Sequence, residues 1–242
     1  MPETSQPKAR HSVGVVLVAA GRGRRLGGET PKQYLALGRH CALRRSAGLF
    51  LSIEAVSCVV PVIHPDDSAL YDAAMAGLTD ARLHAPVHGG DTRAASVRRG
   101  LEALRSASPD LVLIHDAARP FVPPQVIADV IAALEISVGA CAALPVVDAL
   151  WRADGNRADT PVPRDGLWRA QTPQGFDFAR ILAAHEQHDG TGADDVAVAR
   201  DAGIEVTFVQ GSEQSYKITT ADDLARARAD AARIDAKADE TP

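Results

Sequence analysis

Residues 13–32 of this chain read VGVVLVAAGRGRRLGGETPK. The first eight are small or β-branched apolar residues, a run typical of a strand that is buried on both faces. The remainder is glycine-rich and carries Arg22, Arg24, Arg25 and Lys32. Glycines let backbone N–H groups approach an anion closely, and clustered cations neutralise its charge. The stretch therefore predicts a buried strand that ends in a binding loop for a nucleoside triphosphate.

Two better-known phosphate loops do not fit this stretch. A P-loop needs a Gly-Lys pair at fixed spacing, and here Lys32 follows Pro31. The dinucleotide pattern G-x-G-x-x-G needs a glycine where this chain has Leu26, and it needs a helix directly behind the loop. Gly27, Gly28 and Pro31 instead keep the chain in a loop. The alternative that stays open is a basic surface loop between a strand and a helix.

The 242 residues suit one large α/β domain, which we place at 13–236. We expect a disordered lead-in at 1–12 and a short tail at 237–242. The net charge of −5 argues against a nucleic-acid partner or an anionic membrane surface. The three cysteines are widely spaced and form no metal or disulfide pattern, and no apolar run is long enough to span a membrane. These features predict a cytoplasmic protein.

Buried strands and helices alternate along most of the chain. Apolar runs predict strands at 13–20, 56–63, 111–115, 138–144 and 205–209, and helical patterns fall at 42–51, 92–104, 123–135, 176–188, 194–202 and 220–236. This alternation predicts a doubly wound, mostly parallel sheet of the Rossmann-like kind. Ligands of such sheets bind beyond the carboxyl ends of the strands. The candidates for the site are therefore the segments 20–32, 88–93 and 116–120, and the segment that follows Leu144.

Residues 145–172 break this pattern. Short alternating segments surround Asp154-Gly155-Asn156, which is a hairpin turn signal. We interpret this region as a β-arm that projects from the sheet. Exposed Leu150, Trp151, Leu167 and Trp168 would then need a partner surface, and a homodimer interface accounts for them best. The alternative is a hairpin that folds back on its own domain.

Two acidic positions are candidates for chemistry. Asp116 directly follows the predicted strand at 111–115, where a carboxylate can hold Mg²⁺ against phosphate oxygens; its alternative role is a helix cap. The pair Asp194-Asp195 suggests either a second metal or a helix N-terminus, and we favour the N-terminus. The turn Gly89-Gly90-Asp91, with Ser96 behind it, suits the edge of a base or a sugar.

Five motifs in order are more specific than any one of them. The segments AAGRGRRLGGETPKQY, GGDTRAASV, HDAARP, RDGLWRAQTPQGF and YKITTADDL together resemble the 2-C-methyl-D-erythritol 4-phosphate cytidylyltransferase family over almost the whole chain. The resemblance implies a nucleotidyltransferase that uses Mg²⁺ or another divalent cation to transfer CMP from CTP to an alditol phosphate. That reaction releases pyrophosphate in the non-mevalonate synthesis of isoprenoids.

The resemblance also implies roles for matched positions. Arg25 and Lys32 would stabilise charge on the reacting α-phosphate, and Asp116 would hold the metal. Arg164 and Lys217 would hold the phosphate of the acceptor, with Arg119 nearby and Arg164 supplied by the other subunit. The nucleotide pocket would be lined by Ala19, Ala20, Gly21, Gly23, Gly90, Asp91, Ser96 and Ala117.

This chain departs from the family pattern on the acceptor side. Ala149 and Ala193 stand where the family usually has threonine, and Trp151 replaces a usual lysine. Each lost hydroxyl could cost about 0.5–1.5 kcal/mol of hydrogen bonding. Two alternatives therefore stay open: a cytidylyltransferase for another alditol phosphate such as ribitol 5-phosphate, and a nucleotide-binding paralogue without turnover.

Overall fold

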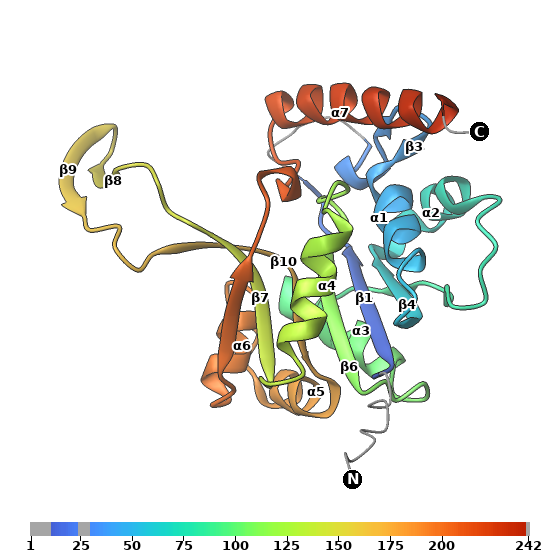
Figure 1. Cartoon of the computed structure of the whole chain (residues 1–242), viewed down its shortest axis with the longest axis horizontal. Helices are drawn as coiled ribbons and strands as arrows, with labels where there is room; N and C mark the ends of the chain where they lie inside the picture. Colours follow the sequence, from blue (N-terminus) through green and yellow to red (C-terminus); the bar gives the residue numbers. More distant parts are fainter. Residues whose placement is uncertain (1–10, 24–29, 241–242) are drawn as a thin grey trace, which may run out of the picture.

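A computed structural model describes residues 11–23 and 30–240 of the chain. Its centre is a seven-stranded sheet with the strand order β11-β7-β10-β6-β1-β4-β5 (Figure 1). The strands of this sheet are β1 Val13–Ala19, β4 Val56–Ile63, β5 Val87–His88, β6 Leu111–Asp116, β7 Gly139–Pro145, β10 Trp168–Asp177 and β11 Val206–Gln210. β10 runs antiparallel to both of its neighbours, and the other described strands of the sheet share one direction. The predicted mostly parallel α/β fold is confirmed.

Helices cover both faces of this sheet. They are α1 Ala42–Leu51, α2 Ser68–Met75, α3 Arg93–Ala103, α4 Pro124–Ala133, α5 Phe178–Gln187, α6 Asp195–Asp201 and α7 Ala221–Glu240. Alternate residues of β1 point to opposite faces, as the two-residue period of a strand requires. Val15 and Leu17 pack with the core of α1, α2 and α4, whereas Val16 packs with that of α3, α5 and α6. The apolar run at 13–20 is therefore a strand buried on both faces.

The strand β10 differs from the prediction. The sequence reading ended the arm at Thr172 and began a helix at Phe176, but β10 continues from the arm into the sheet and lies between β6 and β7. Its buried residues include the polar Gln171, Thr172 and Gln174, so no apolar pattern marks it. Each of these side chains is hydrogen-bonded inside the fold, which makes their burial tolerable.

The predicted β-arm is present. β8 Leu150–Asp154 and β9 Arg157–Val162 form an antiparallel hairpin, and this hairpin projects from the body of the molecule rather than folding back on it (Figure 1). Nearly all of its residues are exposed. The arm leaves the sheet at the end of β7 and returns through β10, so the sheet anchors both of its ends.

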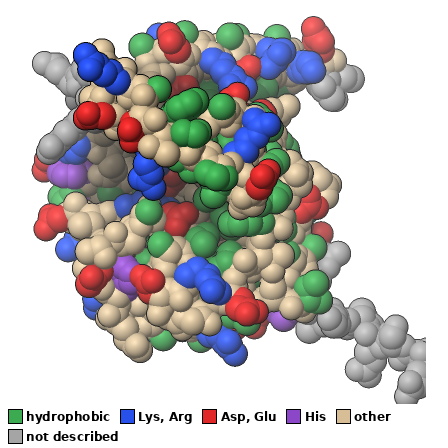
Figure 2. All heavy atoms as spheres, turned by 90° about the vertical axis from the view of Figure 1, so that its left-hand side faces the viewer, with side chains coloured by type: hydrophobic (Ala, Val, Ile, Leu, Met, Phe, Trp, Pro, Cys, Tyr) green, Lys and Arg blue, Asp and Glu red, His purple; other side chains and the backbone are tan. Residues whose placement is uncertain are grey.

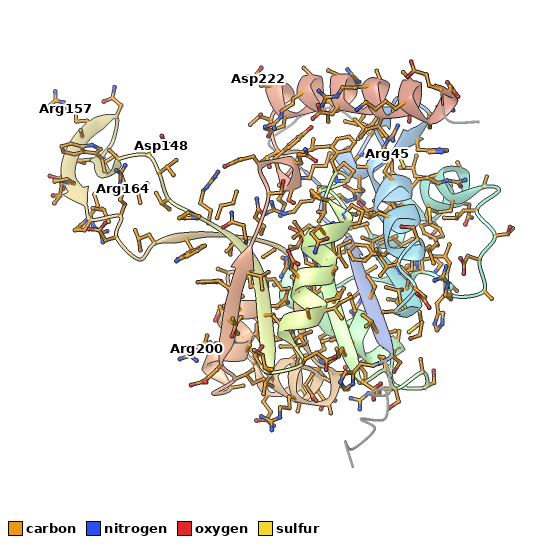
Figure 3. The ribbon with its side chains drawn as sticks, viewed as in Figure 1. Arg45, Asp148, Arg157, Arg164, Arg200 and Asp222 are labelled. Carbon is orange, nitrogen blue, oxygen red and sulfur yellow. The ribbon has the colours of Figure 1, made fainter. Side chains whose placement is uncertain are left out.

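The two ends of the predicted domain are tied to the body. Ser12 belongs to the predicted lead-in, yet its backbone N–H and its hydroxyl both donate to the carboxylate of Asp110. Helix α7 runs past the predicted boundary at 236 to Glu240. Its residue Asp235 pairs at 2.7 Å with Arg45, which lies beneath the helix in Figure 3. None of the described helices is long and apolar enough to cross a membrane.

Candidate active site

A cleft of about 710 Å³ opens at the carboxyl ends of β1, β4 and β6. This is the edge at which a parallel sheet presents its ligand. Three of the segments proposed from sequence meet there. The lining residues that matter below are Ala19, Ala20, Gly21, Gly23, Lys32, Gly90, Asp91, Arg93, Ser96, Asp116 and Lys217.

The loop after β1 is held by Gln33 and Lys32. The buried Gln33 amide donates to the carbonyl oxygens of Ala19 and Gly21, the latter at 3.1 Å. A Cβ on Gly23 would lie 3.2 Å from Cγ of Lys32, so the loop backbone packs on the stem of that lysine. The ammonium of Lys32 donates to the carbonyl of Ile218 at 2.6 Å. The described part of the predicted phosphate loop is thus fixed at the cleft, and Arg24 and Arg25 lie outside the described residues.

Arg22 lies in the predicted phosphate-binding loop, but its guanidinium contacts residues of this chain. Its guanidinium donates to the buried Asp67 at 2.9 Å and to Asp66, and it lies 2.6 Å from Nδ1 of His64. These partners come from the segment after β4, the neighbouring strand. Arg22 therefore connects the loop after β1 to the segment after β4 at the edge of the cleft, and two carboxylates balance its charge.

The opposite wall is the turn before α3. The hydroxyl of Ser96 donates to the carbonyl of Thr92 at 2.9 Å, and it accepts from the N–H of Gly90 at 3.1 Å. A Cβ on Gly89 would lie 2.5 Å from that of Ala20, so only glycine allows this turn to approach the first loop. Gly90, Asp91 and Ser96 thus line the cleft together with Ala19 and Ala20, as predicted for a nucleotide pocket.

Asp116 lies at the centre of the cleft's charges. One of its oxygens is 2.7 Å from Nζ of Lys217, and the other is 3.2 Å from Nε of Arg93. Burial raises the pKa of Asp116, but the positive charges of Arg93 and Lys217 outweigh burial and hold the pKa well below its usual range. The Nε of Arg119 is a further cation at 4.0 Å. Asp116 is therefore ionised within a net positive cluster.

A chain of hydrogen bonds fixes the backbone of Asp116. Its N–H donates to the hydroxyl of Thr172 at 3.1 Å, and that hydroxyl lies 3.0 Å from Nδ1 of the buried His115. The Nε2 of His115 lies 3.1 Å from the carbonyl oxygen of Arg119. Burial lowers the pKa of His115 to about 4, so the ring is neutral and can donate from Nε2 while it accepts at Nδ1. His115 thus supports the backbone of Asp116 through Thr172.

Three predicted site residues do not line this cleft. Ala117 is fully buried, and its neighbour Ala118 forms part of the wall instead. Arg119 donates to the carbonyl of Ser215 at 2.7 Å and faces Asp116 from behind the cleft wall. Arg164 is exposed on the projecting arm, well away from the body of its own subunit (Figure 3). The first two lie next to the site, and Arg164 does not reach it within one chain.

Sequence reasoning did not place Arg93 in the site, and it gave Asp195 only a role at a helix N-terminus. Arg93 begins α3, where the helix dipole disfavours a cation, and this mismatch was the available signal. Asp194 caps α6 by accepting from the N–H of Ala197, which confirms the predicted helix N-terminus. Asp195 instead is buried and pairs with Arg93 and His185. An acidic residue in the first turn of a helix looks ordinary, so no local pattern distinguishes it.

The residues around Asp116 fit a divalent cation that is bound partly by substrate. Among residues 11–23 and 30–240, no three His, Cys, Asp or Glu side chains gather as a metal cage. Mg²⁺ commonly takes one or two carboxylates and completes its shell with water and substrate phosphates. Asp116, beside a loop suited to phosphate, meets that requirement.

The mostly parallel sheet, with its cleft at the carboxyl ends of β1, β4 and β6, is that of an α/β nucleotidyltransferase. The family model described as "IspD: 2-C-methyl-D-erythritol 4-phosphate cytidylyltransferase" matches residues 13–232. The chain belongs to this family, which confirms the resemblance inferred from its five motifs.

Three relatives illustrate the match. The 2-C-methyl-D-erythritol 4-phosphate cytidylyltransferase of Cereibacter sphaeroides is 49% identical over 212 residues, which are 88% of this chain and 93% of that protein. The bifunctional enzyme IspD/IspF of Paramagnetospirillum magneticum is 52% identical, over 88% of this chain and 55% of its own length. A crystal structure of the cytidylyltransferase from Thermus thermophilus superposes with a TM-score of 0.73 at 33% identity, covering 89% of this chain and 97% of that one.

Proposed function

We propose that this chain transfers CMP from CTP to 2-C-methyl-D-erythritol 4-phosphate and releases pyrophosphate, a step of isoprenoid synthesis. Its family membership supports this function. The observation that carries the proposal is that Lys32 and Lys217 line one cleft with the glycine-rich loop and Asp116. This arrangement suits a substrate with several phosphates, because the cations can neutralise charge as it develops on the reacting phosphorus.

The chemistry needs placement rather than a covalent nucleophile. An oxygen of the acceptor phosphate attacks the α-phosphorus of CTP, and the bond to the β-phosphate oxygen breaks as pyrophosphate leaves. The attacking oxygen is already anionic, so no strong general base is required. Lys32 and Lys217 would hold the two phosphate groups in line against their mutual repulsion. These two cations are far apart in the chain, and the fold alone brings them together.

A divalent cation is part of the proposal. When bound, it would neutralise phosphate charge, and Asp116 is the residue of this chain that would hold it. The ion would arrive with CTP, since the described residues offer no complete cage. Activity should be lost in chelator and regained with Mg²⁺, whereas turnover in metal-free buffer would contradict this part.

The acceptor is tested by a screen. Pyrophosphate release is measured with CTP and a panel of 2-C-methyl-D-erythritol 4-phosphate, ribitol 5-phosphate and related alditol phosphates. Ribitol 5-phosphate is the second candidate acceptor, because Ala149 and Ala193 lack the hydroxyls that are usual in the family. Both alanines are exposed. We expect activity with the methylerythritol phosphate. Activity with ribitol 5-phosphate alone would overturn that choice, and CTP binding without turnover on any acceptor would favour a non-catalytic paralogue.

A homodimer through the β-arm completes the proposed assembly. Large apolar side chains are exposed on the arm and at its root, and Figure 2 shows such side chains gathered in the middle of the face on which the arm projects. They are Val147 at 65% exposure, Trp151 at 56%, Phe208 at 42%, Trp168 at 41% and Leu167 at 38%. A partner subunit would cover these side chains, and the arm could then carry Arg164 to the partner's cleft. Light scattering that gives the mass of one chain at assay concentration would contradict this assembly.

The cytoplasm is the compartment that we propose. The cysteines Cys41, Cys58 and Cys141 are all buried and unpaired, which suits a reducing cytoplasm. We therefore place the enzyme there together with its small-molecule substrates, CTP and the alditol phosphate.

A further inference from the structure

Asp195 is a fully buried carboxylate behind the cleft wall. It begins α6, and its N–H donates to the amide oxygen of Gln174 at 3.0 Å. The N–H of Val196 donates to the same oxygen at 3.1 Å. Because Gln174 lies in β10, next to the strand that carries Asp116, the sheet itself fixes the position of Asp195 relative to the cleft.

Arg93 joins Asp195 to Asp116. Its Nη2 lies 2.8 Å from Oδ2 of Asp195, and its Nε lies 3.2 Å from Oδ1 of Asp116. Burial lowers the pKa of Arg93, but the two carboxylates outweigh burial and raise that pKa above its usual value. The guanidinium is thus charged, and its neighbouring nitrogens Nε and Nη2 each face a different carboxylate.

A simpler role for Asp195 would be to stabilise the N-terminus of α6. Asp194 already does this, because its carboxylate accepts from the N–H of Ala197 at 3.0 Å. The oxygens of Asp195 face Arg93 and the Nε2 of His185, the latter at 3.2 Å. Burying a carboxylate is costly unless it is paired, so these two contacts are what its burial serves.

We infer that Asp195 is a positioning residue for the transfer reaction, acting through Arg93 on Asp116. With Nη2 of Arg93 facing Asp195, only Nε reaches Asp116, and the second oxygen of Asp116 stays with Lys217. Without Asp195, the guanidinium can turn and grip both oxygens of Asp116, since arginine favours two-pronged contacts with a carboxylate. Lys217 then loses Asp116 as its partner, and its ammonium is no longer held at its place in the cleft. This inference rests on the function proposed above.

The test compares Asp195→Asn with Asp194→Asn. Both variants remove one charge at the start of α6, and asparagine keeps the helix cap at 194. Turnover is normalised to folded sites by calorimetric titration with CTP and Mg²⁺. We expect Asp195→Asn to lower kcat by about tenfold to a hundredfold, as displacement of catalytic groups does. Its CTP affinity should change by less than about threefold, and Asp194→Asn should resemble the wild type.

A double-mutant cycle separates positioning from a general structural effect. Arg93→Lys keeps the charge but replaces the planar guanidinium, with its separate Nε and Nη2 donors, by a single ammonium nitrogen. If Asp195 acts through Arg93, then Asp195→Asn should lower kcat no further in the Arg93→Lys background. His185→Gln gives a milder disturbance of the same carboxylate, and it serves if Asp195→Asn fails to fold. It should lower kcat severalfold, and only when Arg93 is present.

Results of two kinds would have different meanings. Equal fractional losses of kcat in the two backgrounds, or a kcat of Asp195→Asn equal to that of Asp194→Asn, would overturn the positioning role. If Asp195→Asn does not fold and His185→Gln is used in its place, an equal loss of kcat with Arg93 and with Arg93→Lys would overturn the role as well. A wild-type protein that binds CTP but turns over no acceptor would instead overturn the proposed function.

Discussion

Lys217 and Asp116 are 101 residues apart in the sequence, yet Nζ of Lys217 lies 2.7 Å from Oδ2 of Asp116. The contact joins the carboxyl end of a central strand to the connector before α7. Both residues line the cleft, so this ion pair is part of the site rather than a surface contact. It places a cation where an acceptor phosphate would approach.

Removal of this cation should stop the reaction more than it weakens the fold. In Lys217→Met, Asp116 keeps Arg93 as a partner, so we expect a loss of about 1–3 kcal/mol in stability. The kcat should fall by about two orders of magnitude or more, because the phosphate of the acceptor loses its counter-charge. Steady-state kinetics and urea unfolding measure the two effects. Lys237→Met, on the exposed part of α7, is the control, and a variant pair with equal kcat would contradict the role of Lys217.

Lys32 should act on the transition state more than on binding. Its ammonium lies at the cleft beside the loop that packs on its stem. In Lys32→Ala we expect kcat to fall by about two to three orders of magnitude, while CTP affinity falls less. Rapid-quench turnover and calorimetry with CTP report the two quantities. Losses of equal size in both would show that Lys32 only binds the nucleotide.

The sequence predicted much of this architecture because its signals are local. The helix at 42–51 and the strand at 56–63 are found at the predicted bounds, since the local pattern of apolar residues decides them. β10 was missed because Gln171, Thr172 and Gln174 are buried, and their hydrogen-bond partners come from distant segments. The pairing of Asp195 with Arg93 is equally non-local. Motifs located the cleft, but only the fold shows which charges face one another.

Gly21 should be required by the ligand rather than by the fold. Among residues 11–23 and 30–240, a Cβ at this position would meet no atom within 4 Å. We therefore expect Gly21→Ala to leave the unfolding free energy nearly unchanged, while the KM for CTP rises by about tenfold because a methyl group blocks the approach of phosphate. Gly48→Ala is the matched control, as its Cβ would also be free of contacts but lies in α1, away from the cleft. An unchanged KM in Gly21→Ala would show that the nucleotide binds elsewhere.

His115 should make the fold sensitive to mild acid. Burial lowers its pKa to about 4, whereas the unfolded chain has a value near 6.5. As the pH falls between these values, the unfolded state takes up a proton that the folded state does not, so stability is complete above about pH 6.5 and declines toward pH 4. The decline should be about 3 kcal/mol from this residue.

The variant His115→Gln isolates that contribution from those of the carboxylates. Glutamine can still donate toward the carbonyl of Arg119 but does not titrate. Urea unfolding at pH 7 and pH 4.5 should therefore show a smaller loss of stability in the variant than in the wild type. If both proteins lose the same free energy over this range, His115 is not the sensitive group.

Arg164 should complete the cleft of the partner subunit. It is exposed on the arm, whereas Lys217 lines the cleft of its own chain (Figure 3). Arg164→Ala and Lys217→Met should each be nearly inactive alone. After the two are mixed in equal amounts and their subunits exchange, half of the dimers are mixed, and one of the two sites in each mixed dimer is intact. About a quarter of the wild-type activity should therefore return, as the two-fold symmetry of the proposed dimer requires. If activity does not return although mass spectrometry detects mixed dimers, Arg164 does not act across the interface.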